Sequence, residues 1–362
     1  MFDKELILEK MESLKQQSGA FIASSTTDYQ AMWIRDHLYM AFSYYYLGMY
    51  DKLIEGVQVI FDVFHKHRYK LEKIIQPRNH CGQLTIKDLI HAKYCAHNLE
   101  EMNTEWGHHQ LDEIGLFLHI VADLDFKNIK VVRNKNDEEI IHLLVFYLLN
   151  VRYWEEPDFG MWEECYIRHS SSIGAVVGGL SYIKRRGLAT MPDELIALGK
   201  NALYKILPCE SRDICAKSHH SHDCDAAQLF LIWPFNIVDN QTADLILHRI
   251  IEGHLTEQNG FHRLVQPFGI NRYWGDDYYR DKSGVSAQWQ WEFLISIIYS
   301  NKKQYELAVK WFKTGANRIT AAGCITEAFI DGKPNNHTPL GWMHALALIA
   351  FSKLPNDLRK NI

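Results

Sequence analysis

The stretch "RDHLYMAFSYYYLG", residues 35–48, decides the fold class of this chain. Apolar and aromatic side chains occupy almost every position, so a helix formed here would present no polar face to water. The stretch 286–300 has the same character, whereas 303–320 is amphipathic at helical spacing. A helix that is apolar all round must be covered on all sides, while an amphipathic helix faces water on one side. The pattern therefore predicts an inner layer of buried helices wrapped by an outer layer.

Helical periodicity recurs along the whole chain, in about twelve segments. The sequence has only 9 prolines in 362 residues, which favours long helices over many short strands. No linker rich in proline, serine or glycine divides the chain, so we expect one all-α domain spanning residues 1–362. Periodicity alone leaves open whether the helices close into a barrel. The predicted helices cover residues 3–17, 35–48, 51–66, 107–124, 137–151, 170–184, 192–206, 223–232, 241–252, 286–300, 303–320 and 338–352.

Composition excludes several classes of protein. The balance of 39 basic and 44 acidic residues argues against a nucleic-acid partner, which would select a basic surface. No apolar run is long enough for a transmembrane helix, and the N-terminus lacks the apolar core of a signal peptide. The 7 cysteines include no CxxC pair, which suits unpaired thiols in a reducing compartment. We therefore expect a cytoplasmic protein without a membrane partner.

The predicted loops combine aromatic residues with charged or amide side chains in several places. Carbohydrate sites need this mixture, because aromatic faces pack on sugar rings while carboxylates and arginine bind paired hydroxyls. The alternative is that such pairs only cap helices or form weak ion pairs on the surface. The motifs are "WIRD" (33–36), "TEWGHHQLDE" (104–113), "DFGMWEE" (158–164), "NRYWGDDYY" (271–279) and "ITEAFIDG" (325–332).

A histidine-rich stretch, "SHHSHDCD" (218–225), is the one candidate for a metal site. It brings together His219, His220, His222, Cys224 and Asp225, all of which are ligand types that zinc accepts. Their spacing matches no familiar closed zinc site, and a solvated loop is the simpler interpretation. We therefore predict no metal and no organic cofactor, and metal-assisted chemistry here remains the least favoured alternative.

The order of motifs "WIRD … WGHHQLD … DFGMWEE … HSSSIGAV … NRYWGDDYY … QWQWEF … TEAF … TPLGWMHAL" resembles glycoside hydrolase family 15, the glucoamylase family. The segments "IHAKY" (90–94), "PDFGMWE" (157–163) and "CDAAQLFLIWP" (224–234) also resemble the related domain of phosphorylase kinase regulatory subunits. The resemblance implies an (α/α)6 barrel with its active site among the loops at one end. It also implies an inverting exo-hydrolase that releases glucose from non-reducing ends of α-glucans, without a cofactor.

The same resemblance implies roles for individual residues. Glu163 matches the general acid of the family, and Glu327 matches the general base. In the inverting mechanism the acid protonates the glycosidic oxygen while the base activates water on the opposite face of the sugar. The matching substrate-binding residues are Trp33, Arg35, Asp36, Trp106, Asp112, Glu164 and Arg272.

The sequence departs from the family at the base motif, which reads Glu-Ala-Phe from Glu327 where glucoamylases commonly have Glu-Gln-Tyr. A polar partner of the base is therefore missing or replaced. Two functions remain open: a hydrolase of short α-linked glucose oligosaccharides, or a regulatory sugar-binding module with little or no turnover. No segment resembles a starch-binding module, so we expect short malto- or isomalto-oligosaccharides as substrates. The sequence leaves linkage preference and oligomeric state open.

Overall fold

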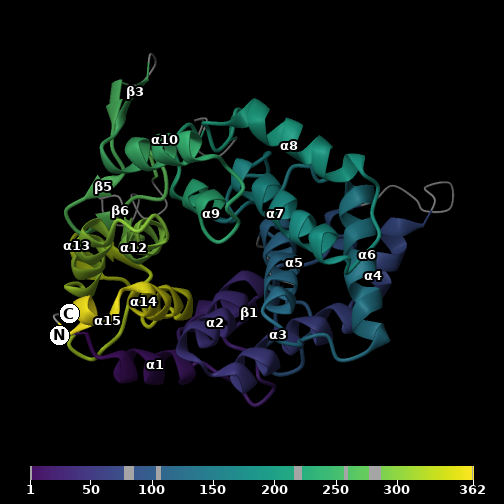
Figure 1. Cartoon of the computed structure of the whole chain (residues 1–362), viewed down its shortest axis with the longest axis horizontal. Helices are drawn as coiled ribbons and strands as arrows, with labels where there is room; N and C mark the ends of the chain where they lie inside the picture. The colour runs from purple at the N-terminus through teal and green to yellow at the C-terminus, as the bar shows by residue number, and fades with distance from the viewer. Residues whose placement is uncertain are drawn as a thin grey trace.

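The helices of this chain form two concentric layers around a common axis (Figure 1). The structure, a computed structural model, describes residues 2–76, 85–102, 107–215, 222–256, 260–276, 287–360 and 362. The inner layer consists of α2 (Ile34–Leu47), α5 (Leu111–Phe126), α7 (Ser170–Arg186), α9 (Leu229–Ile232), α12 (Glu292–Asn301) and α14 (Gly341–Lys353).

The inner helices close into a ring. Each one packs against the next in chain order, and α14 returns to pack against α2. The backbones of α5 and α7 approach closely, since a Cβ atom on Gly115 would lie 2.4 Å from the backbone carbon of Ala175. Glycine permits this contact because it has no side chain. The prediction of an all-α (α/α)6 barrel is confirmed.

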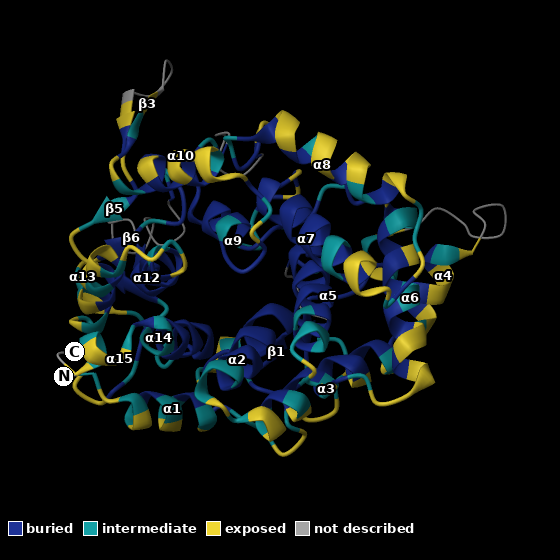
Figure 2. Cartoon of the chain, in the orientation of Figure 1, coloured by how far each residue is buried: buried dark blue, intermediate teal, exposed yellow. Residues whose placement is uncertain are grey.

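The outer layer covers the ring. Helix α3 packs on α2, α8 on α7, α10 on α9, α13 on α12 and α1 on α14, while α4 and α6 pack against each other beside α3. Figure 2 shows the inner helices buried all round and the outer helices exposed along one side, as the two hydrophobic patterns predict. The outer helices are α1 (Lys4–Glu12), α3 (Tyr50–Lys66), α4 (Arg68–Ile75), α6 (Lys135–Val151), α8 (Glu194–Ile206), α10 (Asn240–Ile251) and α13 (Tyr305–Ala316).

The predicted helix boundaries differ from the structure in a few places. Helix α4 lies within a stretch that we predicted to be non-helical, and α15 (Asn356–Arg359) follows the last predicted helix. The helix predicted over 223–232 is a single 3₁₀ turn, Ala226–Gln228, followed by the short α9. The helix predicted from 286 begins at Glu292, because Gln288–Trp289 forms strand β7.

Short antiparallel strands join the loops at one end of the barrel. Strand β1 pairs with β2, β3 pairs with β4, and a five-stranded sheet runs in the order β5-β6-β7-β8-β9. This sheet fixes three loops relative to one another, namely those around residues 271–276, 287–291 and 327–335. The strands are β1 (Met32–Trp33), β2 (Lys93–Tyr94), β3 (His254–Thr256), β4 (Gly260–His262), β5 (Val265–Gln266), β6 (Gly269–Ile270), β7 (Gln288–Trp289), β8 (Ala328–Ile330) and β9 (Lys333–Pro334).

Two of the cysteines are paired. A disulfide joins Cys165 to Cys215, which are 50 residues apart in the sequence and 5.5 Å apart between Cα atoms. The prediction of unpaired thiols is therefore wrong for this pair, since only the tertiary fold brings the two residues together. The argument for a reducing compartment loses that support. Among the described residues, no helix is long and apolar enough to cross a membrane.

Candidate active site

The N-terminal ends of several inner helices surround one cavity. Trp33 comes directly before α2, Trp291 before α12, and Trp342 lies in the first turn of α14. The cavity has a volume of about 600 Å³, within the range of pockets that hold small molecules. Its wall includes Tyr29, Trp33, Arg35, Asp36, Trp162, Glu163, Glu164, Cys165, Arg272, Tyr273, Trp289, Trp291, Glu327 and Trp342.

Most of the residues predicted from the sequence meet in this cavity. Both glutamates assigned to acid–base chemistry line it, and so do five of the predicted substrate-binding residues. Asp112 is not among the lining residues, and it lies behind Arg35. Trp106 lies outside the described residues. The predicted residues on the wall are Trp33, Arg35, Asp36, Glu163, Glu164, Arg272 and Glu327.

Glu163 lies on the loop that precedes α7, and its side chain is 11% exposed. Its Oε1 atom accepts a hydrogen bond from Gln110 Nε2 at 2.8 Å and lies 3.4 Å from Arg35 Nη2. Burial raises the pKa of Glu163 to about 7, although Arg35 and the Gln110 hydrogen bond oppose the rise. A carboxyl group with this pKa is partly protonated at neutral pH, which a general acid requires.

The backbone of Glu163 is strained. Its φ angle is +64°, in the left-handed region that non-glycine residues rarely adopt. The loop is held on both sides of this residue, because Trp162 Nε1 donates to Asp225 Oδ1 at 2.8 Å and Cys165 forms the disulfide. Such a conformation persists only when the surrounding structure restrains it.

Glu327 has a different environment, directly before β8. Its Oε1 atom accepts a hydrogen bond from the Tyr29 hydroxyl at 2.7 Å, and its Oε2 atom accepts one from Asn335 Nδ2 at 2.5 Å. The ring of Tyr29 stacks on His337 with centroids 3.9 Å apart. Each oxygen of this carboxylate thus has a side-chain donor. The polar partner expected to be missing or replaced at the base motif is thus replaced by Tyr29 and Asn335.

Arg35 and Asp36 occupy the first turn of α2, next to both glutamates. Arg35 Nη1 donates to Gln110 Oε1 at 2.7 Å and to Asp112 Oδ2 at 3.0 Å, and its guanidinium carbon lies 5.2 Å from the Trp342 ring centroid. Asp112 therefore orients Arg35 from behind. Burial raises the pKa of Asp36 to about 6, although the charge of Arg35 opposes the rise.

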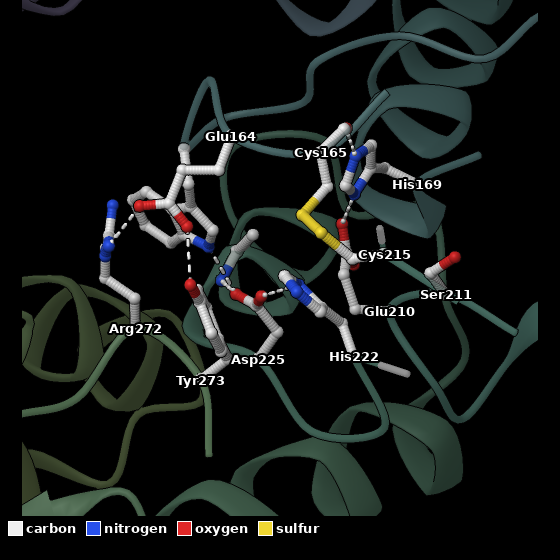
Figure 3. Close-up of polar contacts among 12 residues, drawn as sticks. Glu164, Cys165, His169, Glu210, Ser211, Cys215, His222, Asp225, Arg272 and Tyr273 are labelled. Carbon is white, nitrogen blue, oxygen red and sulfur yellow. Dashed lines mark hydrogen bonds and ion pairs between the residues drawn. A yellow bond between two sulfur atoms is a disulfide. The ribbon is translucent and has the colours of Figure 1, made fainter. Parts of the chain in front are cut away.

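Glu164 and Arg272 form an ion pair on the cavity wall (Figure 3). Arg272 Nη2 donates to Glu164 Oε1 at 2.5 Å, and the Tyr273 hydroxyl donates to Oε2 at 2.5 Å. Two nitrogens of Arg272 also donate to Asp276, each at 2.9 Å, and the guanidinium lies 4.5 Å from the Trp289 ring centroid. Buried, charge-assisted bonds of this kind fix the arginine where it can bind vicinal hydroxyls.

The histidine-rich stretch is not a solvated loop where it is described. His222, Cys224 and Asp225 are all buried, so that interpretation is wrong for them. Asp225 caps the 3₁₀ turn that leads into α9, and this role pulls the preceding residues into the protein. His219 and His220 lie outside the described residues.

Sequence reasoning missed three side chains that contact the two glutamates. Gln110 belongs to a quoted motif but received no role. Tyr29 lies 298 residues from Glu327 in the sequence, and Asn335 follows a hairpin whose geometry sets its position. The Glu-Ala-Phe departure was the one signal that a replacement partner existed, and it did not say which residue.

Comparisons with known proteins agree with the fold. The family profile described as "Glycosyl hydrolases family 15" matches residues 4–313. A protein named "Probable phosphorylase b kinase regulatory subunit alpha" from Drosophila melanogaster is 25% identical over 321 residues, covering 79% of this chain and 24% of that protein. Its Caenorhabditis elegans namesake is 26% identical over 310 residues, covering 72% and 24%. This chain thus spans about a quarter of the length of these relatives.

Solved structures share the whole fold at low sequence identity. The structure titled "Glycosidase Wild Type" has a TM-score of 0.77 and 18% identity, and the match covers 97% of both chains. The glucoamylase from Saccharomycopsis fibuligera has a TM-score of 0.64 and 16% identity, covering 99% of this chain and 96% of that one. These likenesses concern the fold, whereas the profile match spans most of the sequence. The chain therefore belongs to glycosyl hydrolase family 15.

Proposed function

We propose that this chain is an inverting, exo-acting α-glucoside hydrolase that releases glucose from the non-reducing ends of short α-linked oligosaccharides. One observation carries the proposal: two glutamates of the same cavity lie in opposite environments. The Glu163 side chain is only 11% exposed and has a raised pKa, whereas Glu327 accepts hydrogen bonds on both oxygens. Glycoside hydrolysis needs one protonated and one ionised carboxyl group.

In this mechanism Glu163 donates its proton to the glycosidic oxygen as the bond to the anomeric carbon breaks. Glu327 accepts a proton from the water that attacks the anomeric carbon from the opposite face. The positive charge of the transition state is spread over the sugar ring, and the carboxylates nearby stabilise it. Inversion leaves room for this water when the two carboxyl groups are about 6.5–9.5 Å apart.

The remaining wall of the cavity supplies sugar recognition. Arg35, Asp36 and Arg272 present charged groups that make paired hydrogen bonds to hydroxyls. Trp33 and Trp342 offer flat apolar faces for the C–H face of a pyranose. A variant of the solved glycosidase, described as being "in complex with glucose", holds that sugar on the same fold, which supports glucose as the unit that binds here.

A regulatory sugar-binding module is the second candidate. It is favoured by the curated relatives, which are named as regulatory subunits of a kinase rather than as hydrolases. Such a module would keep the cavity and bind sugar without turnover. We also retain the proposals of a single domain over residues 1–362 and of a cytoplasmic location.

Incubation of the purified protein with maltose, isomaltose, maltotriose and trehalose tests the proposal, with glucose measured over time. The hydrolase predicts release from at least one substrate, and release from maltotriose one residue at a time. Calorimetric titration of the same sugars provides the second readout. Binding without glucose release from any of them would contradict hydrolysis and support the regulatory module.

A further inference from the structure

Three side chains of types that bind metals meet beside Glu163, and one of them lies on the same loop. Cys165, Cys215 and His222 are all buried, and a ring nitrogen of His222 and the two sulfur atoms lie within 4.8 Å of one another. Figure 3 shows the imidazole of His222 below the two sulfur atoms. Thiolate and imidazole are the ligands that zinc prefers in proteins.

The two ring nitrogens of His222 have different surroundings. Its Nδ1 atom lies 3.2 Å from Asp225 Oδ2, while its buried Nε2 atom has no hydrogen-bond partner among the described residues. The ring is fixed further by stacking on Tyr273, with centroids 4.2 Å apart. A carboxylate on one ring nitrogen sets the tautomer that leaves a lone pair on the other, an arrangement that accompanies most metal-bound histidines.

Asp225 is itself held by hydrogen bonds, and these contacts therefore also fix the orientation of His222. Its Oδ1 atom accepts hydrogen bonds from Trp162 Nε1 and from the backbone N–H of Ala227, both at 2.8 Å. The disulfide accounts for the positions of the two sulfur atoms. It gives no partner to the buried Nε2 of His222, which has none among the described residues, and a buried polar atom without a partner is unfavourable.

We propose that, when the disulfide is reduced, Cys165, Cys215 and His222 bind a zinc ion, with water in the fourth position. A dithiol reductant supplies two electrons and two protons to the S–S bond and itself becomes a disulfide. Zinc then displaces both thiol protons into solvent. Two thiolates and a neutral imidazole balance the charge of the ion. A tetrahedral site needs ligand atoms ~3.3–3.8 Å apart, which a small separation of the freed sulfurs provides.

The zinc ion would replace the disulfide as the restraint on the loop that carries Glu163. Cys165 lies two residues after Glu163, whose left-handed backbone requires restraint on both sides. Trp162, on the other side, is bonded to the same Asp225 that orients His222. The disulfide and the zinc ion are therefore alternative restraints on the loop that carries Glu163. Binding itself does not depend on whether the protein hydrolyses glycosides.

Metal analysis of the reduced and oxidised protein tests the inference. The full chain is reduced with a dithiol, dialysed against zinc chloride and then against metal-free buffer, and zinc per chain is measured by atomic emission. We expect one zinc per reduced chain that is absent from the oxidised chain and from Cys215→Ser and His222→Ala. We expect Asp225→Asn to bind about 10–100-fold more weakly. Matched controls are Cys324→Ser and the exposed His248→Ala, which keep the zinc.

Cobalt provides a readout that needs no variant. Cobalt(II) added to the reduced wild-type chain is expected to give the intense visible bands of a tetrahedral site together with thiolate-to-cobalt charge transfer, and zinc should abolish both. The proposal is overturned if these bands do not form, if reduced protein retains no zinc, or if Cys215→Ser or His222→Ala retains as much zinc as wild type.

Discussion

The two sides of the candidate active site each hold a glutamate, and the surroundings of these two glutamates differ. On one side, Glu163 lies on a strained loop, is shielded from water and is contacted by Gln110 and Arg35. On the other side, Glu327 precedes a strand of the small sheet and accepts hydrogen bonds on both oxygens from Tyr29 and Asn335. Burial favours the neutral form of a carboxyl group, and donated hydrogen bonds favour the charged form.

This difference suits the two glutamates to the proposed roles of acid and base. Desolvation is the largest influence on the pKa of Glu163, and two side-chain donors hold Glu327. The scaffold also differs between the halves. The loop that carries Glu163 is restrained by the disulfide and by the Trp162 hydrogen bond, whereas the segment that carries Glu327 is restrained by the pairing of β7 with β8. The two halves can therefore be changed separately and their effects compared.

Removal of either carboxyl group should have the largest effect. We expect Glu163→Gln and Glu327→Gln each to lower kcat by about 10²–10⁴-fold, the usual contribution of general acid–base catalysis. Glucose release from the best substrate of the panel measures the loss. Glu155→Gln is the matched control, since Glu155 is exposed and does not line the cavity. Wild-type turnover in either cavity variant would refute the corresponding role.

An activated substrate should separate the two halves. α-Glucosyl fluoride has a leaving group that needs no protonation, so a general acid becomes dispensable while a general base does not. We expect Glu163→Gln to recover most of its activity on the fluoride and Glu327→Gln to remain inactive. Fluoride release with an ion-selective electrode measures both. Recovery in the Glu327 variant instead would exchange the two assignments.

Loss of a hydrogen bond to the base should have an intermediate effect. Hydrogen bonds to charged groups contribute about 1.5–3 kcal/mol, so Tyr29→Phe and Asn335→Ala should each lower kcat by about tenfold or more. KM should change less, because these donors act on Glu327 rather than on the sugar. Unchanged kcat in both variants would show that the two donors do not hold the base.

The pH dependence of kcat/KM should report the protonation of Glu163. Glu163 must be protonated to act, and its pKa is raised to about 7, so kcat/KM should fall as pH rises through about 7. Gln110 donates to the carboxylate and thereby lowers the pKa of Glu163. Gln110→Ala should therefore move this alkaline limb upward by about half to one pH unit. A downward shift would contradict the contact.

The sequence predicts the parts of the molecule that depend on local pattern. Apolar faces place the inner and outer helices, and the motif order identifies both glutamates through the family resemblance. Contacts across large sequence separations escape this reasoning. Tyr29 meets Glu327 only because the ring closes, and Cys165 meets Cys215 because α8 packs back along α7. The short helix α4 was missed because a weak local pattern is stabilised there by packing against α6.

The sequence also did not predict the backbone conformation of the loop that carries Glu163. No feature of "DFGMWEE" predicts that Glu163 takes a positive φ angle or that Asp225, far along the chain, anchors Trp162. The sequence assigns His222 and Asp225 to a solvated loop because their spacing matches no familiar closed zinc site. Capping of the turn before α9 buries them instead.

The anomer of the first glucose released tests the central claim most directly. Proton NMR during the first minutes of hydrolysis, before mutarotation, resolves the two anomers. Direct attack by water activated by Glu327 predicts β-glucose from an α-linked substrate. Initial release of α-glucose would require a covalent intermediate, and it would contradict the assignment of an acid and a base on opposite sides of the sugar.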